Sequence, residues 1–185
     1  MGSETESLAR TSLAATERDR LFTEYVTAQL EQLRRLAYVL CQDSHRADDL
    51  VQEAITKLYL HWHNIHKVAN LDRYVRAIVV REFLNTQRLG WARRVRLSGR
   101  PPEDSGPAPA SVEDRLVLEA ALKQMPPRQR AVVVLRFMCD LSVEDVADIL
   151  GCSDGTVKSQ TSAGLVTLRR HLGEFLMEGR ANARR

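Results

Sequence analysis

The chain has 185 residues, which permits one large domain or two small ones. Hydrophobic residues make up 44% and charged residues 28%, as in ordinary globular proteins, and the longest apolar run, residues 131–135, is far shorter than the roughly 20 residues that span a bilayer. The net charge of +3 is too small to indicate a nucleic-acid partner by itself, so the position of the charges must decide.

The first fifteen residues predict a flexible N-terminal tail without a targeting function. The stretch is charged and lacks the apolar segment of a secretory signal peptide. Glu6 stands where N-myristoylation requires serine or threonine.

The three cysteines have no regular spacing and indicate small buried hydrophobic residues in a reducing compartment: Cys41, Cys139 and Cys152. We therefore expect a cytoplasmic protein.

Residues 16–97 predict an N-terminal helical domain. Thr16 and Asp19 have the spacing of a capping box. Behind them apolar residues recur every three or four positions, which places one stripe along a helix: Phe22, Val26, Leu30, Leu33, Ala37 and Leu40. The same periodicity predicts helices at about residues 46–62 and 71–87.

Residues 98–111 separate this domain from a second one. Their sequence, SGRPPEDSGPAPAS, predicts a flexible linker because proline, glycine and serine dominate it. In the second domain, residues 112–175, Pro127 fits the first turn of a densely apolar helix that we expect to be the most buried. Residues 176–185 form a basic tail. Almost no strand signal occurs, so the expected fold class is all-α, with two small helical domains.

Residues 140–160, DLSVEDVADILGCSDGTVKSQ, predict two short helices joined by a tight turn. Ser142 and Asp145 form a capping box for the first helix, and Gly151 is suited to end it. Val157 lies on the inner face of the second helix, so Ser159 points outward. This pattern fits a helix-turn-helix. The alternative is an ordinary helical hairpin with a solvated face.

The polar start of the second helix suits DNA. Small side chains let backbone N–H groups at a helix N-terminus approach phosphates. Ser153 can cap the helix and contact a phosphate, and Thr156 lies in the same turn. Lys158, Ser159 and Gln160 can reach base edges in a major groove.

Two segments resemble a known family. MPPRQRAVVVLRF, followed by LSVEDVADILGCSDGTVKSQTS, is similar to the C-terminal DNA-binding domain of extracytoplasmic-function sigma factors, the small alternative initiation subunits of bacterial RNA polymerase. ADDLVQEAITKLY, residues 47–59, resembles the core-binding segment of the same family. The motifs occur in the family's order, and TVKSQTS resembles an actinobacterial subgroup.

The resemblance implies a binding protein rather than an enzyme, without a cofactor. Such factors carry core RNA polymerase to promoter DNA, where the N-terminal domain reads the minus-ten element and the C-terminal domain the minus-thirty-five element. Family members are often held inactive by an anti-sigma factor, and an anti-sigma partner is therefore an expectation from the resemblance alone. The rival interpretation is a two-domain helix-turn-helix regulator that acts without core polymerase.

Three polar residues of the segment at 47–59 share a helical face opposite the apolar one: Asp49, Gln52 and Glu53. An acidic, hydrogen-bonding face suits a basic helical partner. By resemblance, this face binds the clamp helices of the largest polymerase subunit. The alternative is a solvated acidic face without a partner.

The stretch from residue 88 to 100 is basic, contains no acidic residue and includes one tryptophan. Arginines beside an aromatic ring suit single-stranded DNA, since guanidinium groups bind phosphates and a base stacks on the ring. By resemblance the end of the third helix and the loop before it bind the minus-ten element. Within residues 81–100 the candidates are Arg81, Arg88, Trp91, Arg93 and Arg94. The alternative is a basic helix end with Trp91 packed on the core. Relatives carry an asparagine near the position of Arg81, so the base-capturing residue is left open.

No positive charge occurs between Lys158 and Arg169, which departs from many relatives. Because phosphate neutralisation dominates affinity for DNA, the second domain should bind DNA weakly alone. Arg128 and Arg130, at the start of the preceding helix, are the candidates for phosphate contacts.

Three histidines lie close together at positions 61, 63 and 66, and His63 and His66 could share a helical face and bind a metal ion. They lack a zinc-binding spacing and a nearby cysteine pair, so we expect a polar helix end and no metal. A hydrolase built on them would need a nucleophile–base pattern, which the sequence does not contain.

Overall fold

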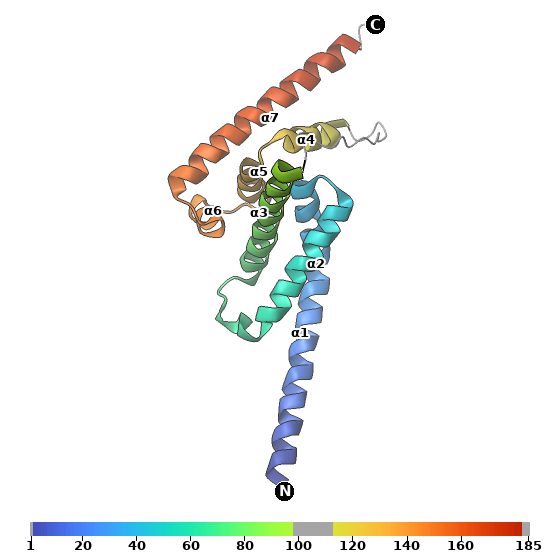
Figure 1. The fold of residues 1–185 in the computed structure, drawn as a ribbon, viewed down its shortest axis with the longest axis vertical. Helices are drawn as coiled ribbons and strands as arrows, with labels where there is room; N and C mark the ends of the chain where they lie inside the picture. Colours follow the sequence, from blue (N-terminus) through green and yellow to red (C-terminus); the bar gives the residue numbers. More distant parts are fainter. Residues whose placement is uncertain (1, 98–112, 183–185) are drawn as a thin grey trace.

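The structure, a computed structural model, describes residues 2–97 and 113–182. This part of the chain contains helices and no strand, which confirms the all-α fold (Figure 1). The α-helices are α1 (Gly2–Cys41), α2 (Ser44–His61), α3 (Leu71–Leu97), α4 (Glu113–Gln124), α5 (Pro127–Val133), α6 (Val143–Leu150) and α7 (Asp154–Asn182).

The first three helices pack into the N-terminal half. Asp43 caps α2 by accepting a hydrogen bond from the backbone N–H of Arg46 at 2.9 Å. At the other end of α2 a 3-10 segment, η1 (Trp62–Lys67), turns the chain toward α3. Leu40, Leu58 and Phe83 are fully buried between the helices. Burying each such side chain stabilises the fold by about 1.5–3 kcal/mol.

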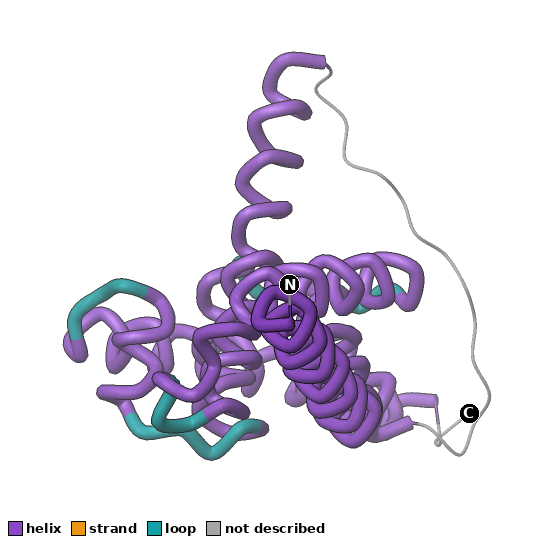
Figure 2. The backbone as a smooth tube through the Cα atoms, turned by 90° about the horizontal axis from the view of Figure 1, so that it is seen from below, coloured by secondary structure: helices purple, strands orange, loops and turns teal. Residues whose placement is uncertain are grey.

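Three helices are longer than expected. α1 begins at Gly2 rather than after a tail, and α3 continues to Leu97 rather than stopping near residue 87. α7 continues to Asn182, into the predicted basic tail at residues 176–185. Residues 3–41 contain neither proline nor glycine, and residues 71–97 contain no proline and only one glycine, so no strong helix breaker intervenes. Figure 2 shows the end of α3 extending beyond the other helices. The predicted linker, residues 98–111, lies outside the described residues.

The C-terminal half is built on α5. Pro127 occupies the first turn, and the helix continues as a π-helical turn, η3 (Val134–Met138). Residues 131–135 are all buried, which agrees with the expected burial of this segment. α7 packs closely on α5 at Gly164, where an added Cβ would lie only 2.6 Å from the Val133 Cγ2 atom. Only glycine permits this approach.

The two halves share one hydrophobic core. Buried residues of α1, α2 and α3 form a single cluster with residues from α5, η3, α6 and the start of α7, among them Val132, Leu135, Val146 and Val157. The predicted domains are therefore packed against each other in this structure.

The cysteines are free thiols and half-buried. Burial raises the pKa of the Cys41 thiol to about 11, so this thiol stays protonated at neutral pH. This environment agrees with the role of a small hydrophobic residue.

Candidate nucleic-acid and polymerase interfaces

The segment from α6 to α7 has the predicted helix-turn-helix geometry. Ser142 caps α6 by accepting a hydrogen bond from the Asp145 N–H at 3.0 Å. Gly151 ends α6 with a left-handed φ of 61°, which costs glycine little. Ser153 Oγ then accepts a hydrogen bond from the Thr156 N–H at 3.2 Å and caps α7. The two caps and the glycine fix the turn between the helices.

The inner and outer faces of α7 are clearly separated. Val157 is completely buried, whereas Lys158 and Ser159 are exposed. Thr156 and Gln160 are half-buried at the edges of the outer face, and Ser159 Oγ donates to the Thr156 carbonyl at 2.9 Å. The outer face thus presents a cation and hydroxyl groups to solvent.

Glu144 is an acidic residue close enough to Lys158, on the outer face of α7, to interact with its charge. Hydrogen bonds from its own backbone N–H and from Ser142 lower the pKa of Glu144, and the charge of Lys158 lowers it further. Glu144 therefore stays ionised beside Lys158.

The two arginines of the α5 start have different surroundings. Arg128 is exposed. Arg130 is 7% exposed, and its guanidinium donates to the carbonyls of Leu40 at 2.5 Å, Lys123 at 3.1 Å and Met125 at 3.2 Å. Burial lowers the pKa of Arg130. The prediction that Arg130 contacts a phosphate is wrong for this arrangement. The guanidinium is buried and donates to three backbone carbonyls, so DNA cannot reach it.

The acidic face of α2 is on the surface. Asp49, Gln52 and Glu53 are exposed, while Leu50, Val51 and Ala54 of the same helix are buried. The helix therefore offers one polar face to a partner.

Lys57 connects this face to α3, a link that the sequence analysis missed. Its Nζ lies 3.4 Å from a Glu53 carboxylate oxygen and 2.6 Å from one of Glu82. The Glu82 carboxylate is the larger cause of a raised pKa at Lys57. The spacing of Glu53 and Lys57 could have suggested the first contact, but Glu82 is brought near only by folding.

The predicted minus-ten residues all lie on α3. Arg88 is exposed at the surface. Trp91, Arg93 and Arg94 belong to the helix, but their side chains lie outside the described part of the structure. Arg81 contacts α6 instead: its Nε donates to the Ile149 carbonyl at 2.9 Å and its Nη2 to the Asp148 carbonyl at 3.3 Å.

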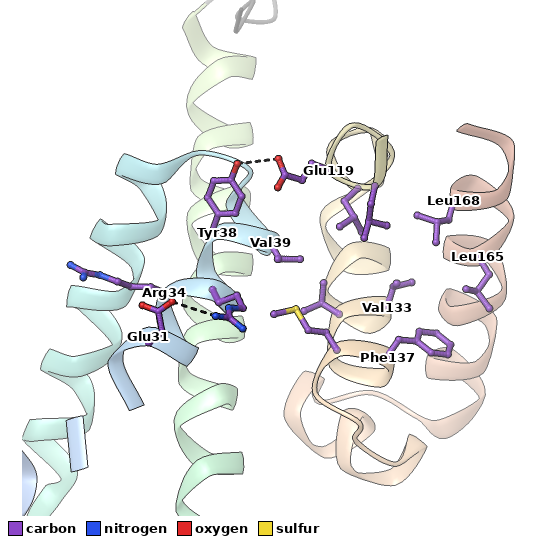
Figure 3. A pocket seen from close by; sticks show the side chains of 14 residues that line it. Glu31, Arg34, Tyr38, Val39, Glu119, Val133, Phe137, Leu165 and Leu168 are labelled. Atoms are coloured by element: carbon purple, nitrogen blue, oxygen red, sulfur yellow. Dashed lines mark hydrogen bonds and ion pairs between the residues drawn. The ribbon is translucent and has the colours of Figure 1, made fainter. Parts of the chain in front are cut away.

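A groove of about 930 Å³ lies between α1 and the C-terminal half (Figure 3). Tyr38 and Val39 line one side, and Val133, Phe137 and Leu165 line the other. Tyr38 donates a hydrogen bond to Glu119 across it at 3.1 Å. The groove was not foreseen because residues of both halves build it.

Neither a membrane span nor a metal cluster is found in the described part of the chain. No helix there is long and apolar enough to cross a bilayer. No group of three or more His, Cys, Asp and Glu residues there could hold a metal ion.

Comparison with known proteins agrees with this arrangement. Residues 25–100 match the family described as Sigma-70 region 2, and residues 115–168 match Sigma-70, region 4. The RNA polymerase sigma-E factor of Streptomyces coelicolor is 36% identical over 165 residues, covering 86% of this chain and 90% of the relative. The ECF sigma factor SigM of Mycobacterium tuberculosis is 33% identical over 145 residues, covering 77% and 72%.

A solved structure shares the arrangement of helices. The sigma factor RpoE, determined in complex with the anti-sigma factor NepR from Bartonella quintana, is 27% identical with a TM-score of 0.71. The likeness covers 82% of this chain and 96% of that one.

Two helical regions in this order, the second with a helix-turn-helix, define a sigma factor of bacterial RNA polymerase. It directs core polymerase to promoters and is an initiation factor, not an enzyme. The chain belongs to the extracytoplasmic-function family of these factors. The family membership that the sequence motifs predicted is thereby confirmed. The Streptomyces and mycobacterial relatives fit the predicted actinobacterial subgroup. The rival interpretation, a regulator that acts without core polymerase, is not favoured.

Proposed function

We propose that three separate surfaces of the chain carry the steps of initiation. The polar face of α2 binds core polymerase, the basic end of α3 binds the minus-ten element, and the first turns of α7 read the minus-thirty-five element. One observation carries the proposal. The start of α7 is exposed and capped by Ser153, while Val157 on the opposite side of the helix is buried and holds it in place.

The start of α7 suits a duplex in two ways. Its N–H groups and helix dipole favour a phosphate beside Ser153, which is exposed. One turn later Lys158 and Ser159 face solvent, and Val157 holds the helix in place from beneath. Lys158 is the long side chain best placed for an acceptor on a base edge, and Gln160 at the edge of the face is a second candidate. Arg128 supplies a phosphate contact.

The polar face of α2 suits a protein partner. Asp49 and Glu53 are exposed and one turn apart, so together they present negative charge to a basic helix. Gln52 adds a hydrogen-bonding group between them. We assign this face to the clamp helices of the largest polymerase subunit.

The end of α3 carries the minus-ten contacts in this proposal. Arg88, Arg93 and Arg94 neutralise phosphates of the separated strand, and Trp91 stacks on a base. Arg81 contributes once it is free of α6.

The protein works in the cytoplasm, beside its polymerase, and we infer an anti-sigma factor as a further partner. The similar sigma factor structure was determined with an anti-sigma factor bound. The apolar groove of Figure 3 offers a surface for such a protein. Co-purification of the tagged chain from its own host, followed by loss of the partner in a Phe137→Asp variant, tests this inference.

Transcription from randomised upstream elements tests the base readout. Purified protein and core polymerase are incubated with templates whose minus-thirty-five region is random, and the transcripts are sequenced. We expect Lys158→Ala to change the preferred sequence, because a base contact is worth about 1–3 kcal/mol of discrimination. If neither Lys158→Ala nor Gln160→Ala changes the preference, α7 does not read bases in the proposed way.

A further inference from the structure

Lys57 lies between two carboxylates that belong to different helices. Its Nζ is 2.6 Å from a carboxylate oxygen of Glu82 on α3 and 3.4 Å from one of Glu53 on α2. The Glu82 side chain is 14% exposed, whereas that of Glu53 is 55% exposed. Because the attraction between charges grows as the distance shortens and as water is excluded, Lys57 pairs mainly with Glu82.

Helix packing fixes this pairing. Leu58 follows Lys57 on α2, Phe83 follows Glu82 on α3, and both apolar side chains are fully buried. The two helices therefore cannot shift past each other without disturbing the core. Asn85, one turn further along α3, donates to the other Glu82 oxygen at 3.5 Å, so both oxygens of this carboxylate have a partner.

Without the Glu82 charge, Lys57 would turn to Glu53. A glutamate four residues before a lysine is the favoured arrangement of an ion pair on a helix. Glu53 and Lys57 have this spacing and already lie 3.4 Å apart. A full pair between them would neutralise one of the two negative charges that the α2 face presents, and a basic partner would then have to displace Lys57.

The Glu82 carboxylate opposes this competition. It matches the charge of Lys57, so that Asp49 and Glu53 keep their charge for a partner. All three carboxylates line one cleft of about 520 Å³ between α2 and α3. Arg46, three residues before Asp49, lines this cleft too, so a further cation already offsets part of the negative charge of the face.

We propose that Glu82 is a positioning residue for polymerase binding, which holds Lys57 against α3 and leaves Glu53 free for a basic helix of the partner. The proposal rests on the assignment of the α2 face to core polymerase. It adds a residue that lies outside this face, on the helix that carries the minus-ten contacts.

A double-mutant cycle of Glu82→Gln and Lys57→Gln tests the proposal. Glutamine has nearly the shape of glutamate and lacks its charge. Surface plasmon resonance with immobilised core enzyme measures the affinity of the full chain without DNA, and circular dichroism checks the fold. Glu24→Gln is the matched control, because it also removes a carboxylate from an ion pair, here with Arg20 on exposed α1.

We expect Glu82→Gln to weaken binding by about threefold to fivefold, the upper range for the cost of breaking an exposed ion pair. Lys57→Gln should bind as tightly as the unaltered chain or more tightly, since position 57 no longer competes for Glu53. Adding Glu82→Gln to Lys57→Gln should then cause no further loss. Glu82→Asp keeps the charge and should retain most of the affinity, and Glu24→Gln should bind normally.

The direction of the Lys57→Gln effect separates this role from a structural one. Both single variants lose the same ion pair, so a structural role predicts weaker binding in both. Weaker binding of Lys57→Gln, an equal effect of Glu82→Gln with and without Lys57, or no effect of Glu82→Gln would overturn the proposal.

Charge reversal on α2 distinguishes a failure of this proposal from a failure of the polymerase assignment. If Asp49→Lys combined with Glu53→Lys leaves the affinity unchanged, the face itself is wrongly assigned. If that double variant binds weakly while the cycle shows no coupling between Lys57 and Glu82, only the positioning role of Glu82 is wrong.

Discussion

Gly164 sets the distance between α7 and α5. Its backbone comes so close that a methyl group would overlap the Val133 side chain at 2.6 Å. Val133 is buried in a helix and has little room to move. The absence of a side chain at this position therefore allows α7 to pack this closely on α5.

We predict that Gly164→Ala lowers the free energy of unfolding by about 1–3 kcal/mol, the usual cost of overpacking. Gly173→Ala is the matched control, because nothing lies within 4 Å of its added Cβ. The control should be neutral or stabilising by about 0.5–1 kcal/mol, since alanine is the better helix former. Chemical denaturation measures both, and equal effects would contradict the close contact at Val133.

Arg128 and Lys158 are assigned two different kinds of DNA contact, a phosphate contact for Arg128 and a base contact for Lys158. Arg128→Ala should reduce transcription from all promoters alike and lower the salt dependence of binding by about one counterion, as the loss of a phosphate contact does. Lys158→Ala should instead change which promoters are used. Titrating salt in binding assays with the polymerase complex separates the two. A change of sequence preference in Arg128→Ala would contradict its assignment to a phosphate.

At the scale of single elements, local sequence signals predicted the helix-turn-helix well. A serine cap, a glycine with positive φ and a second serine cap act over three or four residues, so the pattern shows them directly. The burial of residues 131–135 followed from their density of apolar side chains. The length of α3 did not follow, because helix ends without a proline or a cap leave no clear local signal.

The polar face of α2 should act as a unit. We predict that Asp49→Lys combined with Glu53→Lys weakens binding to core polymerase by at least about tenfold, because both charges would repel a basic partner. Surface plasmon resonance with immobilised core enzyme measures the affinity, and circular dichroism confirms the fold. Glu24→Lys, an exposed change on α1, is the control. Unchanged affinity of the double variant would exclude this face.

At the scale of the whole molecule, the shared core was not predictable. Arg130 shows the reason: its position before an apolar helix suggested a DNA contact, but folding brings it to the carbonyl of Leu40 and over the ring of Phe83. Contacts between residues 90 positions apart leave no periodic trace in the sequence. The same holds for the pairing of Arg73 with α6.

The shared core leads to a prediction for limited proteolysis. We expect cleavage within residues 98–111, whose composition favours an accessible linker, to give two fragments that remain together on gel filtration. The buried apolar contacts between the halves hold them after the chain is cut. Elution as two separate species at low protein concentration would contradict a stable interface.

Run-off transcription tests the central claim most directly. Core polymerase is given a library of genomic fragments with and without the purified protein, and the transcript starts are mapped. The account predicts new starts that appear only with the protein present, each preceded by a common pair of elements spaced as minus-ten and minus-thirty-five. Binding of the protein alone to a palindromic duplex, without any polymerase-dependent start, would contradict it.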